Sequence, residues 1–339
     1  MGRNTRKEEN TMTKFIIRRL LLGIIIVFCG AFVVYAVLRC LPTSYVESIA
    51  RQRSALPGGK SYSQWLAELN NVYHLDTDIF SGFMYWLKDA IRGNFGDSWF
   101  YNVPVVSKFK DVIGYSIVIN IITLFLEVII CIPLGILAAR KQYSKTDYTV
   151  TVIALMGISL PSFFLATLLK YVFSIKLGWF DLYGLVGRFH DQLSFWGQIG
   201  DIAMHMVLPI VTLTMLSLGG LMRYTRTNML EVLNADYIRT ARAKGLSESK
   251  VINKHAFRNT LIPLVSYMSY LLPSMFGGSM ITETLFQIPG IGYVSYPAMI
   301  AGDIPFTMFY LVFIIVLTQV SLIVADIMYA VVDPRVRVN

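Results

Sequence analysis

The stretch Val112–Ala139, VIGYSIVINIITLFLEVIICIPLGILAA, contains one charged residue, Glu127. An apolar run of roughly 20 residues is long enough to cross the hydrocarbon core of a bilayer as a helix. A helix also satisfies the backbone polar groups within the segment, which lipid requires. Five more runs of this kind occur along the chain: Phe15–Leu38, Thr149–Val172, Ile202–Met222, Leu261–Ile281 and Pro305–Val332.

The composition supports the same interpretation. The chain is 55% hydrophobic and 15% charged, which lies outside the usual balance of a soluble domain. The sequence therefore predicts an all-α, polytopic membrane protein with about six transmembrane helices. The net charge of +9 does not indicate nucleic-acid binding, because Lys and Arg flank the apolar runs instead of forming one stripe.

Lys and Arg are distributed unevenly about the predicted helices. They cluster in residues 1–14, at Arg140 and Lys141, and in a loop over 223–260, whereas the loop Thr284–Ile304 has neither. Cytoplasmic loops carry the excess of basic residues, and long segments cross the membrane largely regardless of charge. We therefore expect a cytoplasmic N-terminal tail at 1–14, a first helix at 15–38, an extracytoplasmic segment at 39–111, a five-helix core at 112–332 and a cytoplasmic C-terminal tail at 333–339.

The extracytoplasmic segment is expected to contain short helices that pack on the outer membrane face. Trp65, Leu66 and Leu69 would share one face of such a helix.

The sequence contains no recognisable enzyme site. Residues 59–61, GKS, resemble the end of a phosphate-binding loop, but that motif requires a glycine where this chain has Ser54. The four histidines are scattered, and no nucleophile, paired-acid or metal-ligand pattern accompanies them. We therefore predict no catalytic residue, no metal site and no cofactor.

The predicted loop at 223–260 has its own helical pattern in NADYIRTARAKGLSESKVINKHAFRNTLIP, Asn234–Pro263. Asn234 is predicted to cap a helix that continues to Lys244. Gly245 suits the left-handed position that ends a helix. Ser247 is predicted to cap a second helix that runs towards Pro263, where the next span begins.

The first of these helices places Tyr237, Thr240, Ala241 and Lys244 on one face, with the small Ala241 near its centre. A partner protein could approach such a face closely. An amphipathic helix that rests on anionic headgroups is the alternative that this spacing leaves open.

The run DYIRTARAKGLSESKVINKHAFRNTLIPLV strongly resembles the cytoplasmic coupling loop, or EAA loop, of permease subunits in the oligopeptide, dipeptide and nickel branch of ABC importers. Ala241 and Gly245 match the general form E-A-A-x-x-x-G, whereas Arg239 and Thr240 replace its Glu and Ala. The peptide branch commonly has R-T-A-R-A-K-G there. Six further segments resemble family motifs in the expected order: RGNFGDSWFYNVPV (92–105), IPLGILAA (132–139), GISLPSFF (157–164), LGWF (177–180), ETLFQIPGIGY (283–293) and DPRVRV (333–338).

The resemblance implies a type I ABC importer permease fold in a bacterial cytoplasmic (inner) membrane, with no ATP hydrolysis by this chain. It implies that the loop contacts a cytoplasmic ATPase through Asp236, Tyr237, Arg239, Thr240, Ala241, Arg242, Ala243, Lys244 and Gly245. The partners that it implies are a second homologous permease in a heterodimer, two ABC ATPase subunits and an extracytoplasmic substrate-binding protein, besides the lipid bilayer. Two departures, LPTS at 41–44 and Asp181 after LGWF, lie in segments expected to take part in substrate capture.

The translocation path is expected to include Glu127, Ser159, Pro161 and Phe163. Pro161 and Pro133 can break or kink helices, and irregular backbone at membrane depth lines protein or a cavity. The glycines of the spans have a second interpretation, which is close helix packing. Glu127 is costly in lipid, so it either lines the path or pairs with a partner subunit.

The predicted function is to carry oligopeptides or dipeptides across the membrane. Nickel chelates or glutathione are alternative substrates within the same family. An ion-coupled secondary transporter is an alternative of another class, although such proteins usually show inverted repeats and clustered carboxylates. A membrane peptidase is a third class, which no catalytic pattern supports.

Overall fold

The computed structural model describes residues 2–40, 45–55, 60–72 and 75–332. Within these residues the regular structure is helical, apart from an isolated β-bridge between Asp97 and Pro104. The predicted C-terminal tail at 333–339 and the LPTS segment at 41–44 lie outside the described residues. The α-helices are α1 (Gly2–Cys40), α2 (Tyr45–Ser54), α3 (Tyr62–Val72), α4 (Ile79–Ile91), α5 (Val105–Arg140), α6 (Lys145–Ser159), α7 (Ser162–Leu169), α8 (Phe195–Leu233), α9 (Asp236–Ala243), α10 (Glu248–Lys250), α11 (Phe257–Phe286), α12 (Ile291–Ile300) and α13 (Ile304–Val332).

Several of these helices are long and apolar enough to cross a bilayer. Among the described residues four single helices qualify, and α6 with α7 adds a fifth span if the bent pair is counted as one. At 1.5 Å per residue the 36 residues of α5 extend about 54 Å, well beyond a hydrocarbon core of about 30 Å. The predicted span Leu261–Ile281 lies within α11, where the side chains of 269–270 and 272–278 are outside the described residues. The polytopic, all-α prediction is confirmed.

The predicted single span Thr149–Val172 is wrong as a continuous helix. The two parts, α6 and α7, meet at 105°, and a π-helical turn, Lys170–Lys176, follows α7. Pro161 has no N–H to continue the helix and forces the preceding residue out of helical geometry. Leu160 accordingly has φ −82° and ψ 127°. Pro133, by contrast, lies inside the continuous helix α5.

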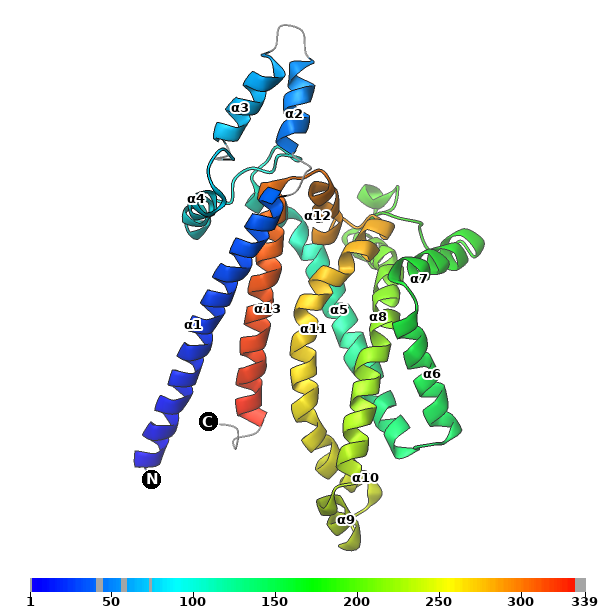
Figure 1. The fold of residues 1–339 in the computed structure, drawn as a ribbon. Coiled ribbons are helices and arrows are strands. Elements are labelled where there is room, and N and C mark those ends of the chain that lie inside the picture. The colour runs from blue at the N-terminus through cyan, green and yellow to red at the C-terminus, as the bar shows by residue number, and fades with distance from the viewer. Residues whose placement is uncertain (1, 41–44, 56–59, 73–74, 333–339) are drawn as a thin grey trace.

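Figure 1 shows the long helices side by side, with α1 against α13, α13 against α11, and α8 against α5, α6 and α11. The hairpin of α2 and α3 projects from one end of this array. Helices α9 and α10 lie at the opposite end, together with the start of α1 and the end of α13. The start of α1, the end of α13 and the charged loop therefore lie on one side of the molecule.

Helices α6 and α8 pack so closely that only glycine fits at their crossing. A Cβ atom on Gly157 would lie 2.5 Å from the carbonyl oxygen of Met215, and one on Gly219 would overlap the carbonyl oxygen of Ala154. Small residues allow backbones to approach in this way where lipid supplies no hydrophobic driving force between helices. The close-packing interpretation therefore holds for these two glycines.

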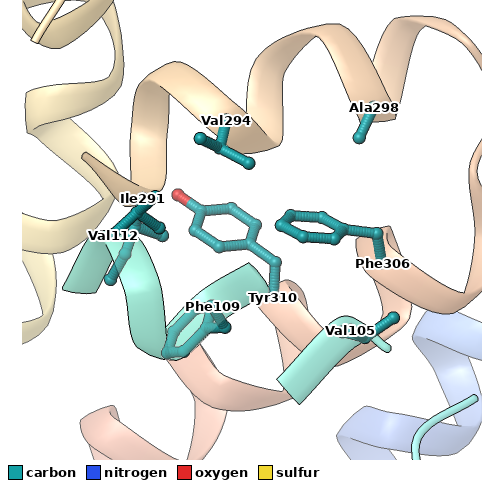
Figure 2. Packing of buried hydrophobic residues seen from close by; sticks show 8 residues of the cluster. All are labelled: Val105, Phe109, Val112, Ile291, Val294, Ala298, Phe306 and Tyr310. Atoms are coloured by element: carbon teal, nitrogen blue, oxygen red, sulfur yellow. The ribbon is translucent and has the colours of Figure 1, made fainter. Parts of the chain in front are cut away.

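A buried apolar cluster joins the ends of three helices near the α2–α3 hairpin. Figure 2 shows side chains from α5, α12 and α13 that converge on Tyr310 and Phe306. Phe306 is fully buried, and Tyr310 is 3% exposed. This packing holds the short α12 against the ends of two spans.

Residues 39–111 contain the short helices that the sequence predicted, α2, α3 and α4. Leu69 of α3 packs with Val46 and Ala50 of α2, and Trp99 completes this small core. Helix α4 packs on α1 through Phe83, whose ring contacts those of Phe28, Phe32 and Tyr35. The extracytoplasmic position of the segment stays a prediction.

Candidate functional site

The charged loop is shorter than the predicted range 223–260. Residues 223–233 continue α8, and residues 257–260 begin α11. We call the remaining stretch, residues 234–256, the loop unit. The prediction that Asn234 caps the next helix is wrong, because Asn234 keeps a helical backbone at the end of α8 and donates its Nδ2 to the carbonyl of Leu230 at 3.0 Å.

Helix α9 ends at Ala243, one residue before the predicted Lys244. Gly245 has φ +75°, the left-handed conformation that favours glycine. Ser247 precedes α10 in an extended conformation but makes no side-chain capping bond. From Val251 to Ala256 the chain forms a π-helical turn that leads directly into α11. Pro263 therefore lies within a helix that has already begun, and the loop unit continues without a break into a membrane helix.

The inner face of α9 is fixed by a small apolar core. Ile238 is fully buried, and Ala241 is 7% exposed. Both pack in one cluster with Met229 of α8 and with Val251 and Ile252 of the π-helical turn. An isolated helix of eight residues is not stable in water, so this core is what holds α9 in place.

The expectation that Ala241 forms the centre of an accessible face is therefore wrong. Spacing alone placed Ala241 with Tyr237 and Thr240, but Ala241 points with Ile238 into the chain's own core. The accessible face consists of the other predicted contact residues, which are all exposed: Asp236, Tyr237, Arg239, Thr240, Arg242, Ala243, Lys244 and Gly245.

Ion pairs order part of this outer face. Arg242 donates through Nη2 and Nε to the two carboxylate oxygens of Glu248, at 2.8 and 3.2 Å. These hydrogen bonds lower the pKa of Glu248 and raise the pKa of Arg242. Tyr237 is 46% exposed, and its hydroxyl accepts a bond from Asn259 at 3.1 Å. The loop unit thus presents a charged helix to its surroundings.

A second candidate site is a cavity of about 510 Å³ between the membrane helices. Its walls come from α5, from α8, from α11 and from the bend between α6 and α7. The polar lining residues on α5 are Asn120, Thr123 and Glu127, at most 4% exposed. Each has a buried polar atom without a hydrogen-bond partner among the described residues: Nδ2 of Asn120, Oγ1 of Thr123 and Oε1 of Glu127.

Comparison with known proteins identifies the chain's family. Residues 131–338 match the family model "Binding-protein-dependent transport system inner membrane component". The chain is 32% identical over 327 residues to the oligopeptide transport system permease protein AppB of Bacillus subtilis (strain 168), covering 96% of this chain and 100% of that protein. This chain belongs to that permease family. The oligopeptide transport system permease protein OppB of Escherichia coli (strain K12) is 33% identical to the permease over 331 residues, with the same coverage.

A solved structure supports the fold of the permease. An inward-facing form of the MetNI methionine ABC transporter matches with a TM-score of 0.54 at 18% identity, over 67% of the permease and 97% of that chain. The ABC importer permease fold, the inner-membrane multi-pass location and the classification as a transport subunit instead of an enzyme are confirmed.

The cavity of the permease includes some of the predicted path residues and omits others. Glu127 lines it, whereas Ser159, Pro161 and Phe163 are not among its lining residues. All three lie at or beside the bend between α6 and α7 and are exposed, Phe163 by 58%. Their neighbours line the cavity instead: Gly157, Ile158, Leu160 and Ser162.

Sequence reasoning missed the polar companions of Glu127. Asn120 and Thr123 lie seven and four positions before it, which places all three on one side of α5. That spacing was a usable signal. Ser217 of α8 and Tyr267 of α11 also line the cavity, but no pattern in the sequence connects them with α5.

Sequence reasoning also missed the role of Glu283 in the motif ETLFQIPGIGY. This residue is 1% exposed, and its Oε2 accepts bonds from the backbone N–H groups of Gly292 and Tyr293, at 2.7 and 3.2 Å. Its Oε1 accepts a bond from Ser116 of α5 at 2.7 Å. A carboxylate at a helix N-terminus satisfies donors that the helix leaves free. Glu283 therefore joins α11, α12 and α5.

Proposed function

We propose that this permease carries oligopeptides or dipeptides across the membrane as part of an ATP-driven importer. Two relatives named as oligopeptide transport permeases match it over nearly its whole length, and this observation carries the choice of substrate. The cavity lined by Glu127 is the proposed translocation path. Its four walls come from different helices, so a shift between those helices would open or close it.

The loop unit is the proposed contact with a cytoplasmic ATPase. Its outer face carries the accessible residues Asp236, Tyr237, Arg239, Thr240, Arg242, Ala243, Lys244 and Gly245, and its inner face is anchored to α8 and α11. An element that is anchored to two membrane helices can pass a displacement to the cavity that those helices line. The basic residues of the loop unit support a cytoplasmic position for this end of the molecule and for both termini.

The proposed assembly contains a second homologous permease, two ABC ATPase subunits and an extracytoplasmic binding protein. The hairpin of α2 and α3 lies at the end opposite the loop unit (Figure 1), which supports contact with the binding protein or the partner permease there. The bent pair α6–α7 exposes Phe163 and Phe164. These two side chains face either lipid or the second permease.

Cysteine cross-linking in the complex tests the loop contact. In a variant that lacks Cys29, Cys40 and Cys131, Thr240→Cys should form a cross-link with cysteines placed on the ATPase surface. Thr149→Cys is the matched control, because Thr149 is also exposed but lies on α6, outside the loop unit. Equal cross-linking of both variants would contradict the proposed contact, and uptake driven by an ion gradient through this chain alone would favour a secondary transporter.

A further inference from the structure

We propose that the cavity binds the protonated amino group of the transported peptide at Glu127. This inference rests on the proposed function and adds a chemical class to it: the substrate carries a cationic ammonium group at the end that enters the cavity.

The first observation is the environment of the acid. Glu127 is 2% exposed, yet it borders a cavity and does not lie in a sealed core. A buried carboxylate is costly unless a cation or several donors compensate it. None of the described residues that line the cavity is Lys, Arg or His. This part of the lining therefore supplies an acid but no counter-charge.

The second observation is the order of polar groups along α5. Asn120, Thr123 and Glu127 each keep a buried atom without a partner in the described part of the chain. The rise of about 1.5 Å per residue separates the first from the last by about 10 Å. An extended peptide advances about 3.3–3.6 Å per residue, so the three groups span about three peptide residues.

The chemistry of these groups matches one end of a peptide. An ammonium group donates up to three hydrogen bonds and accepts none, so it suits the carboxylate. The Asn120 amide and the Thr123 hydroxyl can donate to the carbonyl oxygens that follow the amino terminus. The remaining wall is mainly apolar and includes Leu213 and Leu216. Such a wall accommodates varied side chains, and its polar members, Ser162, Ser217 and Tyr267, carry no charge.

The cavity is large enough for this ligand. Its volume of about 510 Å³ falls within the range of roughly 300–1,000 Å³ that is typical of small-molecule sites. A basic side chain from the second permease is the competing source of positive charge, and the experiment is designed to separate the two.

The test uses the purified complex of the permease with its partner subunits, without the binding protein. Its thermal unfolding midpoint is measured with trialanine and with N-acetyltrialanine, which has the same backbone but lacks the ammonium group. A ligand that binds only the folded state raises the midpoint. Trialanine should raise it, and N-acetyltrialanine should not.

Glu127→Gln should weaken the apparent affinity for trialanine on the order of tenfold or more, because it replaces a charge-assisted hydrogen bond with a neutral one. Glu127→Asp, which keeps the charge, should retain part of the response. Glu231→Gln is the matched control, since it removes a carboxylate from an exposed position on α8 that does not line the cavity.

The inference is overturned if, in the wild type, both peptides shift the midpoint equally or neither peptide shifts it. It is also overturned if Glu127→Gln leaves the trialanine response unchanged. Loss of the second permease from the purified Glu127→Gln complex would overturn it as well, because that result would assign the acid to the subunit interface. Failure of the proposed function is recognised separately, as absence of ATP-dependent trialanine uptake by the complete wild-type system.

Discussion

Replacement of Ile238 by alanine should release α9 from the loop unit while it leaves the membrane helices intact. Ile238 is fully buried and packs in the small core that holds the helix against α8 and the π-helical turn before α11. The exposed residues of α9, including Arg239, do not contribute to that core. The perturbation therefore separates the stability of the loop unit from the chemistry of its outer face.

The expected cost follows from the burial. Truncation of a buried isoleucine to alanine costs about 2–5 kcal/mol, and the lower end applies where the surroundings can collapse into the space. Because α9 lies at the edge of the molecule and can collapse into the space, we expect Ile238→Ala to cost about 2–3 kcal/mol. Because 1.4 kcal/mol corresponds to a tenfold change in an equilibrium constant, local opening should become roughly 30- to 150-fold more frequent.

Amide hydrogen exchange measures this opening directly. Protection of residues 236–246 should fall by the same factor in Ile238→Ala, and protection within α5 and α8 should not change. Arg239→Ala is the control, since its side chain is 73% exposed and surface substitutions usually cost less than about 0.5 kcal/mol. Both variants should reduce coupling between ATP hydrolysis and uptake, but only the first should change exchange. Unchanged exchange in Ile238→Ala would refute the assignment of this core as the anchor of α9.

Three further predictions concern buried carboxylates that join distant segments. Asp147→Asn should lower the unfolding free energy by about 2–4 kcal/mol in detergent, because Asp147 is 2% exposed and Arg226 binds both its oxygens, at 2.6 and 2.8 Å; an unaltered unfolding midpoint would show that the pair is not structural. Glu283→Gln should lower the unfolding free energy by about 1–3 kcal/mol, because the backbone N–H groups of Gly292 and Tyr293 lose a charged acceptor. Amide exchange should become faster in α12 alone, and unchanged protection of α12 would argue against this role of Glu283. Asp303→Ala should lower the unfolding free energy by about 2 kcal/mol, because it removes the acceptor for the Phe306 N–H at the start of α13 and for donors in residues 98–100. Limited proteolysis should then cleave residues 94–104 faster than in the wild type. Cleavage at the wild-type rate would count against this role of Asp303.

The predictable part of the fold is the part that one-dimensional patterns determine. The apolar runs predicted the spans, because a segment in lipid must hydrogen-bond its own backbone N–H and C=O groups and a helix does so. Gly245 was predictable because a left-handed residue that ends a helix favours glycine. The two prolines show the limit of such patterns. Pro133 lies within a continuous helix and Pro161 lies at a bend of 105°, and the residue type alone does not distinguish these outcomes.

The candidate sites show a similar limit. Helical spacing placed Ala241 on one face with Tyr237, but it did not indicate which face of α9 is buried. The decisive contacts come from Met229 and Ile252, before and after α9 in the chain. Ser159, Pro161 and Phe163 do not line the cavity, whereas Leu160 and Ser162 between them do. The sequence predicted one continuous span there, so it did not indicate which side chains beside the bend would reach the cavity.

Helix α8 links the two candidate sites, which suggests how one influences the other. Ser217 and Gly220 of this helix line the cavity, and Met229 packs against the loop unit. Between these positions, from Leu221 to Leu233, the sequence LMRYTRTNMLEVL has neither proline nor glycine. An uninterrupted helix transmits displacement between sites better than a hinge does, and both sites contact α8.

A proline within this link therefore provides the sharpest test of coupling. Thr227 is exposed, so Thr227→Pro adds no buried side chain, but it removes one helical hydrogen bond and kinks α8 at a cost of about 3 kcal/mol. We expect trialanine still to bind the cavity and the ATPase still to cross-link with the loop unit, while substrate no longer stimulates ATP hydrolysis. Thr227→Ala, which keeps the helix, should behave as the wild type. If Thr227→Pro retains full stimulation, the displacement passes through another route, and the π-helical turn that joins the loop unit to α11 becomes the element to alter next.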